Sequence, residues 1–259
     1  MSQSIAILTL MTRNLDKLGY PTDDVRFNLG YSQGDGSSFS GPIDLKVHGP
    51  RLLPDVSKEI WTTIDCELKI ERDSGCRYVH ERSVALNVDG KCVELTDATE
   101  YGGVAQKLAL HKLVVALEAD IISASEKNNE DGYKLIESYV SEEELVWSFR
   151  THSLAVELYK VPDQDHDPFA HLGVTDDLDA SIEEVLSGSM SIFGSKVVIS
   201  LLDEDGEPAI MLAENCTWGH SYTTGDATLR GLRRELVSEA VQQARETYKM
   251  LLRPTLKAA

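Results

Sequence analysis

The sequence predicts an α+β fold in which antiparallel sheets pack against long helices. Short runs of alternating apolar and polar residues, joined by turns that contain glycine, predict antiparallel strands. Two longer stretches, residues 104–125 and 228–252, have apolar residues at helical spacing. Each follows a set of predicted strands, so both halves share the order strands, hairpin, long helix. A remote duplication would give this order, although residue identity between the halves is slight.

Length and composition predict a folded chain of two compact units. The 259 residues exceed the usual size of one domain, and 42% are hydrophobic and 26% charged, close to globular averages. We place an N-terminal α+β unit at residues 1–140 and a C-terminal acidic α+β unit at residues 141–259.

The first elements are a helix and a set of strands. Apolar residues at helical spacing predict a helix over residues 4–18. Alternation predicts strands over residues 25–31, 61–70 and 78–88, and a further hairpin turns at residues 89–90. Together these strands form an antiparallel meander with one wet face.

A core helix follows the meander. Residues 104–125 carry apolar side chains on more than one stripe, which predicts a helix buried on two sides. One stripe consists of Val104, Leu108, Val115 and Ile122, and the other of Leu110, Val114, Leu117 and Ile121. The polar residues 127–132 predict the loop that ends this helix.

The second unit begins with strand-like residues and ends in a helix. Residues 146–161 are rich in strand-forming side chains, and residues 197–202 and 209–213 flank an acidic hairpin at residues 203–206. Residues 228–252 form the last helix, which Asp226 or Thr228 would cap. Its packing stripe includes Leu229, Leu236, Val241 and Tyr248. With basic residues on its opposite face, this helix could pack on the chain's own acidic body or on a second copy, giving a homodimer.

Charge is the strongest compositional signal. There are 43 acidic and 25 basic residues, a formal net charge of -18. Such a field repels nucleic acid and anionic membranes and attracts basic protein surfaces. A role in solubility alone is the alternative. The N-terminal apolar stretch lacks the basic residues and cleavage site of a signal peptide, and no run reaches membrane-spanning length, so we expect a cytoplasmic protein.

The segment between Val161 and Lys196 contains acidic residues and neither lysine nor arginine. We predict that it is the main partner-binding surface, with a smaller acidic cluster before it. The predicted partner-binding residues are Glu142, Glu143, Glu144, Asp163, Asp165, Asp167, Asp176, Asp177, Asp179, Glu183 and Glu184.

The acidic segment also contains residue types that bind metal ions: Asp163, Asp165, His166, Asp167 and His171. Their spacing fits neither an EF-hand nor a His-Glu-x-x-His helix. We therefore predict a solvated acidic loop without a metal or other cofactor, with adventitious metal binding as the alternative. The four cysteines contain no Cys-x-x-Cys pair, which favours isolated buried thiols over a zinc site.

Residues 31–39 form the densest local motif, in which a Ser-Gln-Gly-Asp-Gly run precedes Phe39. Its glycines could admit an anion to the backbone, but no lysine follows and no helix is predicted next, which favours a structural hairpin turn. Ser37 or Ser38 with His80 and Asp35 would supply hydrolase residue types, but the Gly-x-Ser-x-Gly elbow is missing. We predict no catalytic residue.

This Ser-Gln-Gly-Asp-Gly-x-x-Phe-x-Gly signature resembles one found in a family of uncharacterised phage and prophage proteins. Residues 75–84 are similar to a later Gly-x-Tyr-Tyr-His segment of that family, and depart from it at Val79, where an aromatic residue is usual. The resemblance covers about residues 25–90. It implies a viral gene that acts inside a bacterium, and implies no activity, fold or catalytic residue.

These observations together predict an acidic, non-enzymatic phage protein that acts in the host bacterial cytoplasm. It would inhibit or modulate a host enzyme that handles DNA or RNA, by occupying the basic nucleic-acid-binding surface of that enzyme. A metal-dependent hydrolase or nuclease that uses carboxylates is one alternative. A structural component of the virion or of its assembly is the other.

Overall fold

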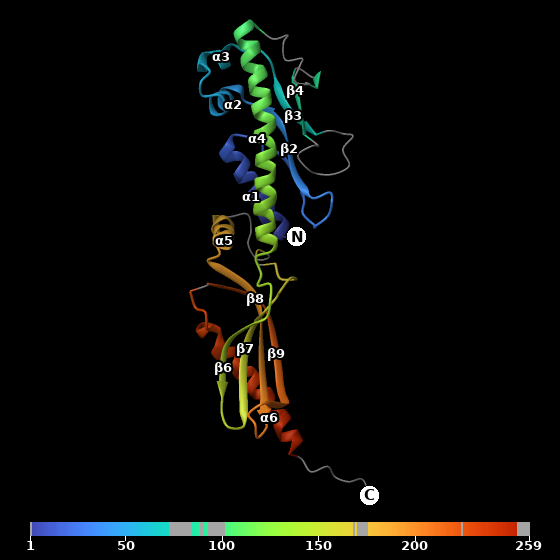
Figure 1. The fold of residues 1–259 in the computed structure, drawn as a ribbon, viewed down its shortest axis with the longest axis vertical. Helices are drawn as coiled ribbons and strands as arrows, with labels where there is room; N and C mark the ends of the chain where they lie inside the picture. The colour runs from blue at the N-terminus through green and yellow to red at the C-terminus, as the bar shows by residue number, and fades with distance from the viewer. Residues whose placement is uncertain are drawn as a thin grey trace. The chain divides into compact units, whose positions relative to one another are not determined.

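The structure is a computed structural model that describes residues 2–72, 84–88, 91–92, 102–167, 169, 176–223 and 225–252. The chain divides into two compact units, Ser4–Lys134 (the N-terminal unit) and Leu135–Ala259 (the C-terminal unit). The sequence analysis placed this division after residue 140. Each unit contains an antiparallel sheet and a long helix, which confirms the α+β prediction (Figure 1).

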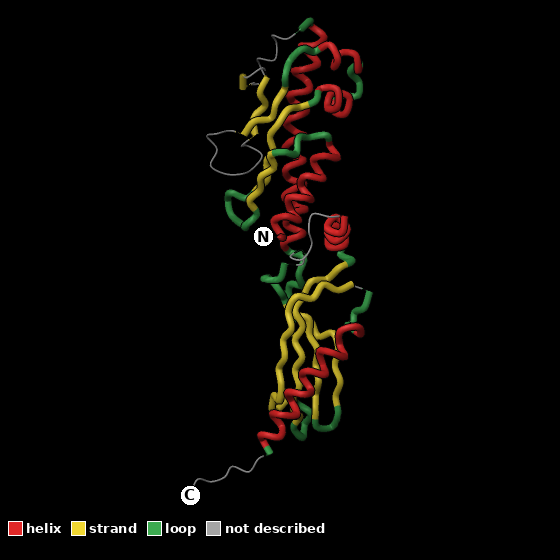
Figure 2. Tube along the Cα trace, turned by 180° about the vertical axis from the view of Figure 1, so that it is seen from behind, coloured by secondary structure: helices red, strands yellow, loops and turns green. Residues whose placement is uncertain are grey.

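The N-terminal unit has a five-stranded sheet on one side and its helices on the other (Figures 1 and 2). The strands occur in sequence order as β1 (Asp24–Asn28), β2 (Gly36–Ile43), β3 (Leu68–Arg72), β4 (Val84–Val88) and β5 (Lys91–Cys92). The helices are α1 (Ser2–Leu18), α2 (Leu45–Leu52), α3 (Lys58–Thr63) and α4 (Val104–Ile136). All neighbouring strands described are antiparallel, as a meander requires.

Two short helices, α2 and α3, lie between β2 and β3. The prediction of a strand over residues 61–70 was wrong for its first half, because Trp61 lies in α3 and the strand β3 begins at Leu68. Helix α2 was not predicted at all. The side chain of Asp44 caps it by accepting a hydrogen bond of 2.8 Å from the backbone N–H of Lys46. Trp61 is fully buried in the core of this unit, which also includes Phe39, Leu68 and Ile70.

Helix α4 differs from its prediction in length. The predicted loop at residues 127–132 is helical, and its residues Asn128 and Asp131 are buried. Asn14 of α1 donates to Asn128 at 3.1 Å, and Asp131 is paired with Lys127 at 2.8 Å. The helix continues because these hydrogen bonds satisfy polar groups that would otherwise favour solvent.

Helix α4 is buried on one side, so the prediction of two buried sides was wrong. The stripe of Leu110, Val114, Leu117 and Ile121 lies in the core. The stripe of Val104, Leu108, Val115 and Ile122 is exposed. Its apolar residues therefore add little to the stability of this unit.

The C-terminal unit has a four-stranded antiparallel sheet with one long helix across a face (Figure 2). Its strands are β6 (Glu144–Arg150), β7 (Leu154–Val161), β8 (Met190–Leu202) and β9 (Pro208–Thr223), and its helices are α5 (Asp176–Leu186) and α6 (Arg230–Leu251). The predicted strand over residues 146–161 is a hairpin of β6 and β7. The predicted acidic hairpin at residues 203–206 joins β8 to β9, both longer than predicted.

Helix α6 packs on the sheet of its own unit. Leu229 and Leu236 are buried in the core with Phe193 and Ile199, Val241 is half-buried, and Tyr248 is exposed. The prediction that Asp226 or Thr228 caps this helix was wrong, because the N-cap position is Leu229, which makes no side-chain cap hydrogen bond. Asp226 nevertheless accepts a hydrogen bond of 3.3 Å from the Gly231 N–H in the first turn. The N-terminal part of the predicted stripe therefore packs within the chain, and a homodimer through α6 stays a prediction.

No helix in the part of the chain that the structure describes is both long and apolar enough to span a membrane.

Candidate functional site

The candidate site lies where β7 ends. Pro162 follows the last residue of β7 and, lacking an N–H, cannot continue the hydrogen-bond ladder. Val161 pairs with Gly194 of β8, so the chain leaves the sheet beside Gly194. The acidic segment thus begins at the edge of a well-paired sheet.

A bulge in β9 faces the same point. Phe193 pairs with His220 and Ser195 pairs with Thr217, which leaves Trp218 and Gly219 opposite one residue of β8. Gly219 has φ +82°, a conformation that favours glycine. A bulge of this kind redirects side chains, and here it brings Trp218 to the end of β7.

These two chain segments form a cavity of about 650 Å³, which we call the Trp218 pocket. Its lining consists of Pro162, Asp163, Gln164, Asp165, His166, Trp218 and Gly219. The six-membered ring of Trp218 packs against the backbone at Gly194, where a Cβ would stand 2.4 Å from Trp218 Cε3. Trp218 is nevertheless 57% exposed, so much of a rigidly supported indole is open to a ligand.

Asp163 holds the two segments together. It is 5% exposed, and its Oδ2 accepts a hydrogen bond of 2.7 Å from the Gly219 N–H. A buried carboxylate that accepts a backbone hydrogen bond is a fixed structural charge. Asp163 is therefore removed from the outer surface on which the sequence analysis placed it, while Asp165 is exposed.

Behind the pocket, His220 and Ser195 share a hydrogen bond of 3.0 Å between Nε2 and Oγ. Burial lowers the pKa of His220 more than the nearby Asp163 charge raises it. Ser195 is only 1% exposed, so its hydroxyl is not open to a substrate. The pair therefore stabilises the bulge beneath Trp218 and is not a nucleophile with its base.

The remaining acidic segment forms an amphipathic helix. In α5, Leu178, Ile182 and Val185 are buried, while Glu183 and Glu184 are exposed. Asp179 is half-buried. Asp176 and Asp177 begin this helix, and their side chains lie outside the described residues.

The smaller acidic cluster lies at the start of β6. Glu142, Glu143 and Glu144 are all exposed, and Glu143 pairs with Lys196 at 2.6 Å. Glu143 precedes β6 and Lys196 lies in β8, so the ion pair links the start of β6 to β8 across the intervening strand β7. The two groups of carboxylates therefore belong to different elements, one at the start of β6 and the other on α5.

The candidate metal ligands do not gather into a metal site. Asp163 accepts from Gly219, and Asp167 accepts a hydrogen bond of 2.9 Å from the Phe169 N–H. His171 lies outside the described residues. Among the residues that the structure describes, no group of three or more His, Cys, Asp or Glu side chains is placed to hold an ion.

The Ser-Gln-Gly-Asp-Gly motif connects β1 to β2, as the hairpin prediction requires. Asp35 accepts from the Ser32 N–H at 2.9 Å, from the Ser32 hydroxyl at 2.8 Å and from the Tyr133 hydroxyl. The Tyr133 hydrogen bond lowers the pKa of Asp35 to about 2. The donors around this turn therefore bind the Asp35 carboxylate. This negative charge occupies the place where a bound anion would have to lie.

Both candidate serines of the triad around this motif are buried and hydrogen-bonded within the unit. Ser37 is buried and donates a hydrogen bond of 3.1 Å to the Ser125 carbonyl of α4. Ser38 is also buried and accepts from Arg72 Nε at 2.9 Å. His80 lies outside the described residues, so its place in the triad stays untested.

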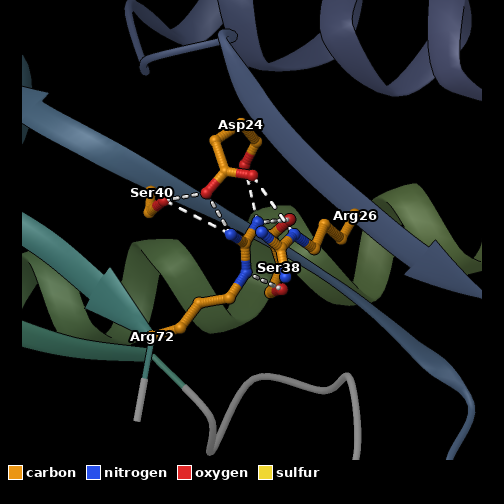
Figure 3. A network of polar contacts seen from close by, with 5 residues as sticks. All are labelled: Asp24, Arg26, Ser38, Ser40 and Arg72. Carbon is orange, nitrogen blue, oxygen red and sulfur yellow. Dashed lines mark hydrogen bonds and ion pairs between the residues drawn. The ribbon is translucent and has the colours of Figure 1, made fainter. Parts of the chain in front are cut away.

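Arg72 belongs to a polar network across β1, β2 and β3 (Figure 3). Its guanidinium donates to the Asp24 carboxylate, to the Asp24 carbonyl at 2.6 Å and to Ser38. Ser40 also donates to Asp24. The guanidinium thus satisfies groups from two neighbouring strands, a structural role for which no signal in the linear sequence was available.

A second network joins α2, α4 and the end of α1. Arg51 pairs with Asp120 at 2.6 Å, and Tyr20 donates to the same carboxylate. His48 is fully buried and donates from Nε2 to the Gly19 carbonyl at 2.9 Å, so its Nδ1 accepts from Arg51 at 3.0 Å. Burial lowers the pKa of His48. His48 is therefore a core histidine with both ring nitrogens hydrogen-bonded.

Comparisons of the chain with protein-family models, with curated proteins and with solved structures found no match. The geometry of the residues is therefore the basis for function. The sequence indicated Asp163 and Asp165 but gave no sign of Trp218, because a single tryptophan has no functional signal until the bulge in β9 places it beside Pro162.

Proposed function

We propose that the chain is a non-enzymatic binding protein that occupies the basic nucleic-acid-binding surface of a host enzyme. The observation that supports this proposal is the uneven distribution of charge. Residues 135–259 contain 22 acidic and 10 basic residues, whereas residues 1–134 contain 21 and 15, and seven of those ten basic residues lie in residues 230–259. An acidic surface of this kind attracts a basic partner and repels nucleic acid.

The exposed carboxylates of α5 and of residues 142–144 supply the docking charge. In α5 the apolar residues Leu178, Ile182 and Val185 are buried, whereas Glu183 and Glu184 are exposed. Preorganised charges on an anchored helix lose little conformational freedom on binding. With the phage-like motif at residues 31–39, this favours a phage protein that acts in the bacterial cytoplasm.

The test measures association with a captured partner. The chain is used as bait in a nuclease-treated bacterial lysate, and the partner is purified and tested for nucleic-acid binding. Asp179→Asn, Glu183→Gln and Glu184→Gln together should slow association, because exposed charges act mainly on encounter rates. Nucleic acid should compete with the chain, and salt should weaken the complex.

A matched variant controls for net charge. This control removes the same number of negative charges, three, at exposed positions of the N-terminal unit, by the changes Asp55→Asn, Glu59→Gln and Asp65→Asn. This variant should associate as fast as the parent. Equal rates for parent, α5 variant and control, or a partner that nucleic acid does not displace, would contradict the proposal.

A further inference from the structure

The Trp218 pocket combines features that recognise one kind of side chain. Trp218 offers an exposed indole, Asp165 an exposed carboxylate and Asp163 a buried negative charge on the same lining. An indole attracts a cation placed over its face, and a guanidinium both stacks on aromatic rings and binds carboxylates through planar N–H donors.

The surroundings favour a cation over a neutral ligand. Between Val161 and Lys196 the sequence has no lysine or arginine, and the lining contains none. His166 is the one lining residue that can become cationic. The volume of about 650 Å³ is ample for one long side chain.

The pocket is also held in place before any ligand arrives. Trp218 packs on Gly194, Gly219 is tied to Asp163 by the 2.7 Å hydrogen bond, and a Cβ on Gly219 would stand 3.3 Å from the His166 ring. An anchor pocket with a fixed aromatic residue is typical of the few positions that dominate binding energy at protein interfaces.

We propose that the Trp218 pocket binds an arginine side chain of the partner, whose guanidinium stacks on Trp218 and pairs with Asp165. This inference rests on the proposed function for its partner, a basic nucleic-acid-binding surface, where arginine is abundant. It adds a specific anchor to a docking surface that is otherwise defined by charge alone.

The probes are three peptides of equal length, rich in arginine, in lysine or in glutamate, and their binding is measured by calorimetry at low and at physiological salt. The parent should bind the arginine peptide more tightly than the lysine peptide, and should not bind the glutamate peptide. Trp218→Leu should lower the affinity for the arginine peptide by about fivefold to tenfold, because a partly desolvated cation–π contact contributes about this much to affinity.

Two control variants match these changes. Phe149→Leu removes another exposed aromatic residue of the same unit, and Asp205→Asn removes an exposed carboxylate outside the pocket. Asp165→Asn should lower the affinity for the arginine peptide more than Asp205→Asn does. Phe149→Leu should leave this affinity unchanged. Circular dichroism of all variants establishes that each is folded.

The results separate this inference from the proposed function. If Trp218→Leu binds the arginine peptide as tightly as Phe149→Leu does, the pocket is not an arginine site, although docking through α5 could still hold. Binding of a neutral oligosaccharide that Trp218→Leu abolishes would also overturn the assignment. In another outcome the pocket prefers arginine, but the α5 variant associates with the partner at the parent rate. That result would contradict the proposed function and would still support an arginine site in the Trp218 pocket.

Discussion

The two units share one architecture and differ in where their charged side chains lie. Both place a long helix against an antiparallel sheet, yet the N-terminal unit pairs Arg72 with Asp24 and Arg51 with Asp120 inside networks that join its own elements. In the C-terminal unit, the carboxylates of α5 are exposed on a helix whose apolar face is buried. Ion pairs therefore join different elements of the N-terminal unit, whereas α5 carries exposed carboxylates on an amphipathic helix.

The largest expected effect is in the core of the N-terminal unit. Leu113 of α4 is fully buried, and Leu113→Ala should lower the free energy of unfolding by about 2–5 kcal/mol because it leaves a cavity. Val115 lies two residues away on the exposed stripe. Val115→Ala should change stability by less than about 0.5 kcal/mol. Urea denaturation of both variants checks this, and equal losses would contradict the one-sided burial of α4.

The Arg72 network should give the next effect. Arg72→Ala removes the donor that satisfies Asp24 and Ser38, and should cost about 1–3 kcal/mol, because partly buried acceptors lose their partner. On the same strand, Lys69 pairs with Glu71 at an exposed position. Lys69→Ala should cost less than about 1 kcal/mol. If urea denaturation gives both variants the same stability, the network does not support the sheet.

Acid should weaken the second network through His48. Because its pKa is lowered in the folded chain, the unfolded chain binds a proton first, and stability falls as the pH drops below about 6.5. His48→Gln keeps a donor and an acceptor without this titration, so its stability should change less between pH 7.5 and pH 5. His152→Gln, at an exposed position, is the control and should follow the parent. Identical pH profiles for parent and His48→Gln would exclude this role.

The smallest effect on folding is expected on α5. Neutralising Glu183 and Glu184 should leave stability unchanged or raise it by up to about 0.5 kcal/mol, because mutual repulsion is relieved. Asp120→Asn removes one charge from the N-terminal unit and should destabilise it, because Arg51 and Tyr20 lose their shared carboxylate. Thermal melting checks this prediction. A larger loss of stability in the α5 variant than in Asp120→Asn would contradict the expected difference between the two units.

Several elements could be read from the chain because their signals are local. Residues 4–18 and 230–251 carry helical periodicity, and glycine-containing turns separate the strands on either side of residues 203–206. The errors occurred where long-range contacts override local preference. Trp61 favours a strand by propensity but is helical and buried. The polar residues 127–132 are helical, and Asn128 and Asp131 among them accept hydrogen bonds from Asn14 of α1.

The candidate site was predictable only in part. Charge identified residues 161–196, since composition needs no fold, but it gave Asp163 and Glu184 the same weight. The structure separates them, because Asp163 is tied to Gly219 and Glu184 is exposed.

The sequence by itself determined the α+β class, the acidic balance and the hairpin turn at residues 31–39, because periodicity, composition and turn chemistry depend on neighbours along the chain. Tertiary structure alone decided which stripe of α4 is buried, which carboxylates are exposed and where Trp218 lies. These properties depend on strand register and on a one-residue bulge in β9, which bring together residues more than fifty positions apart.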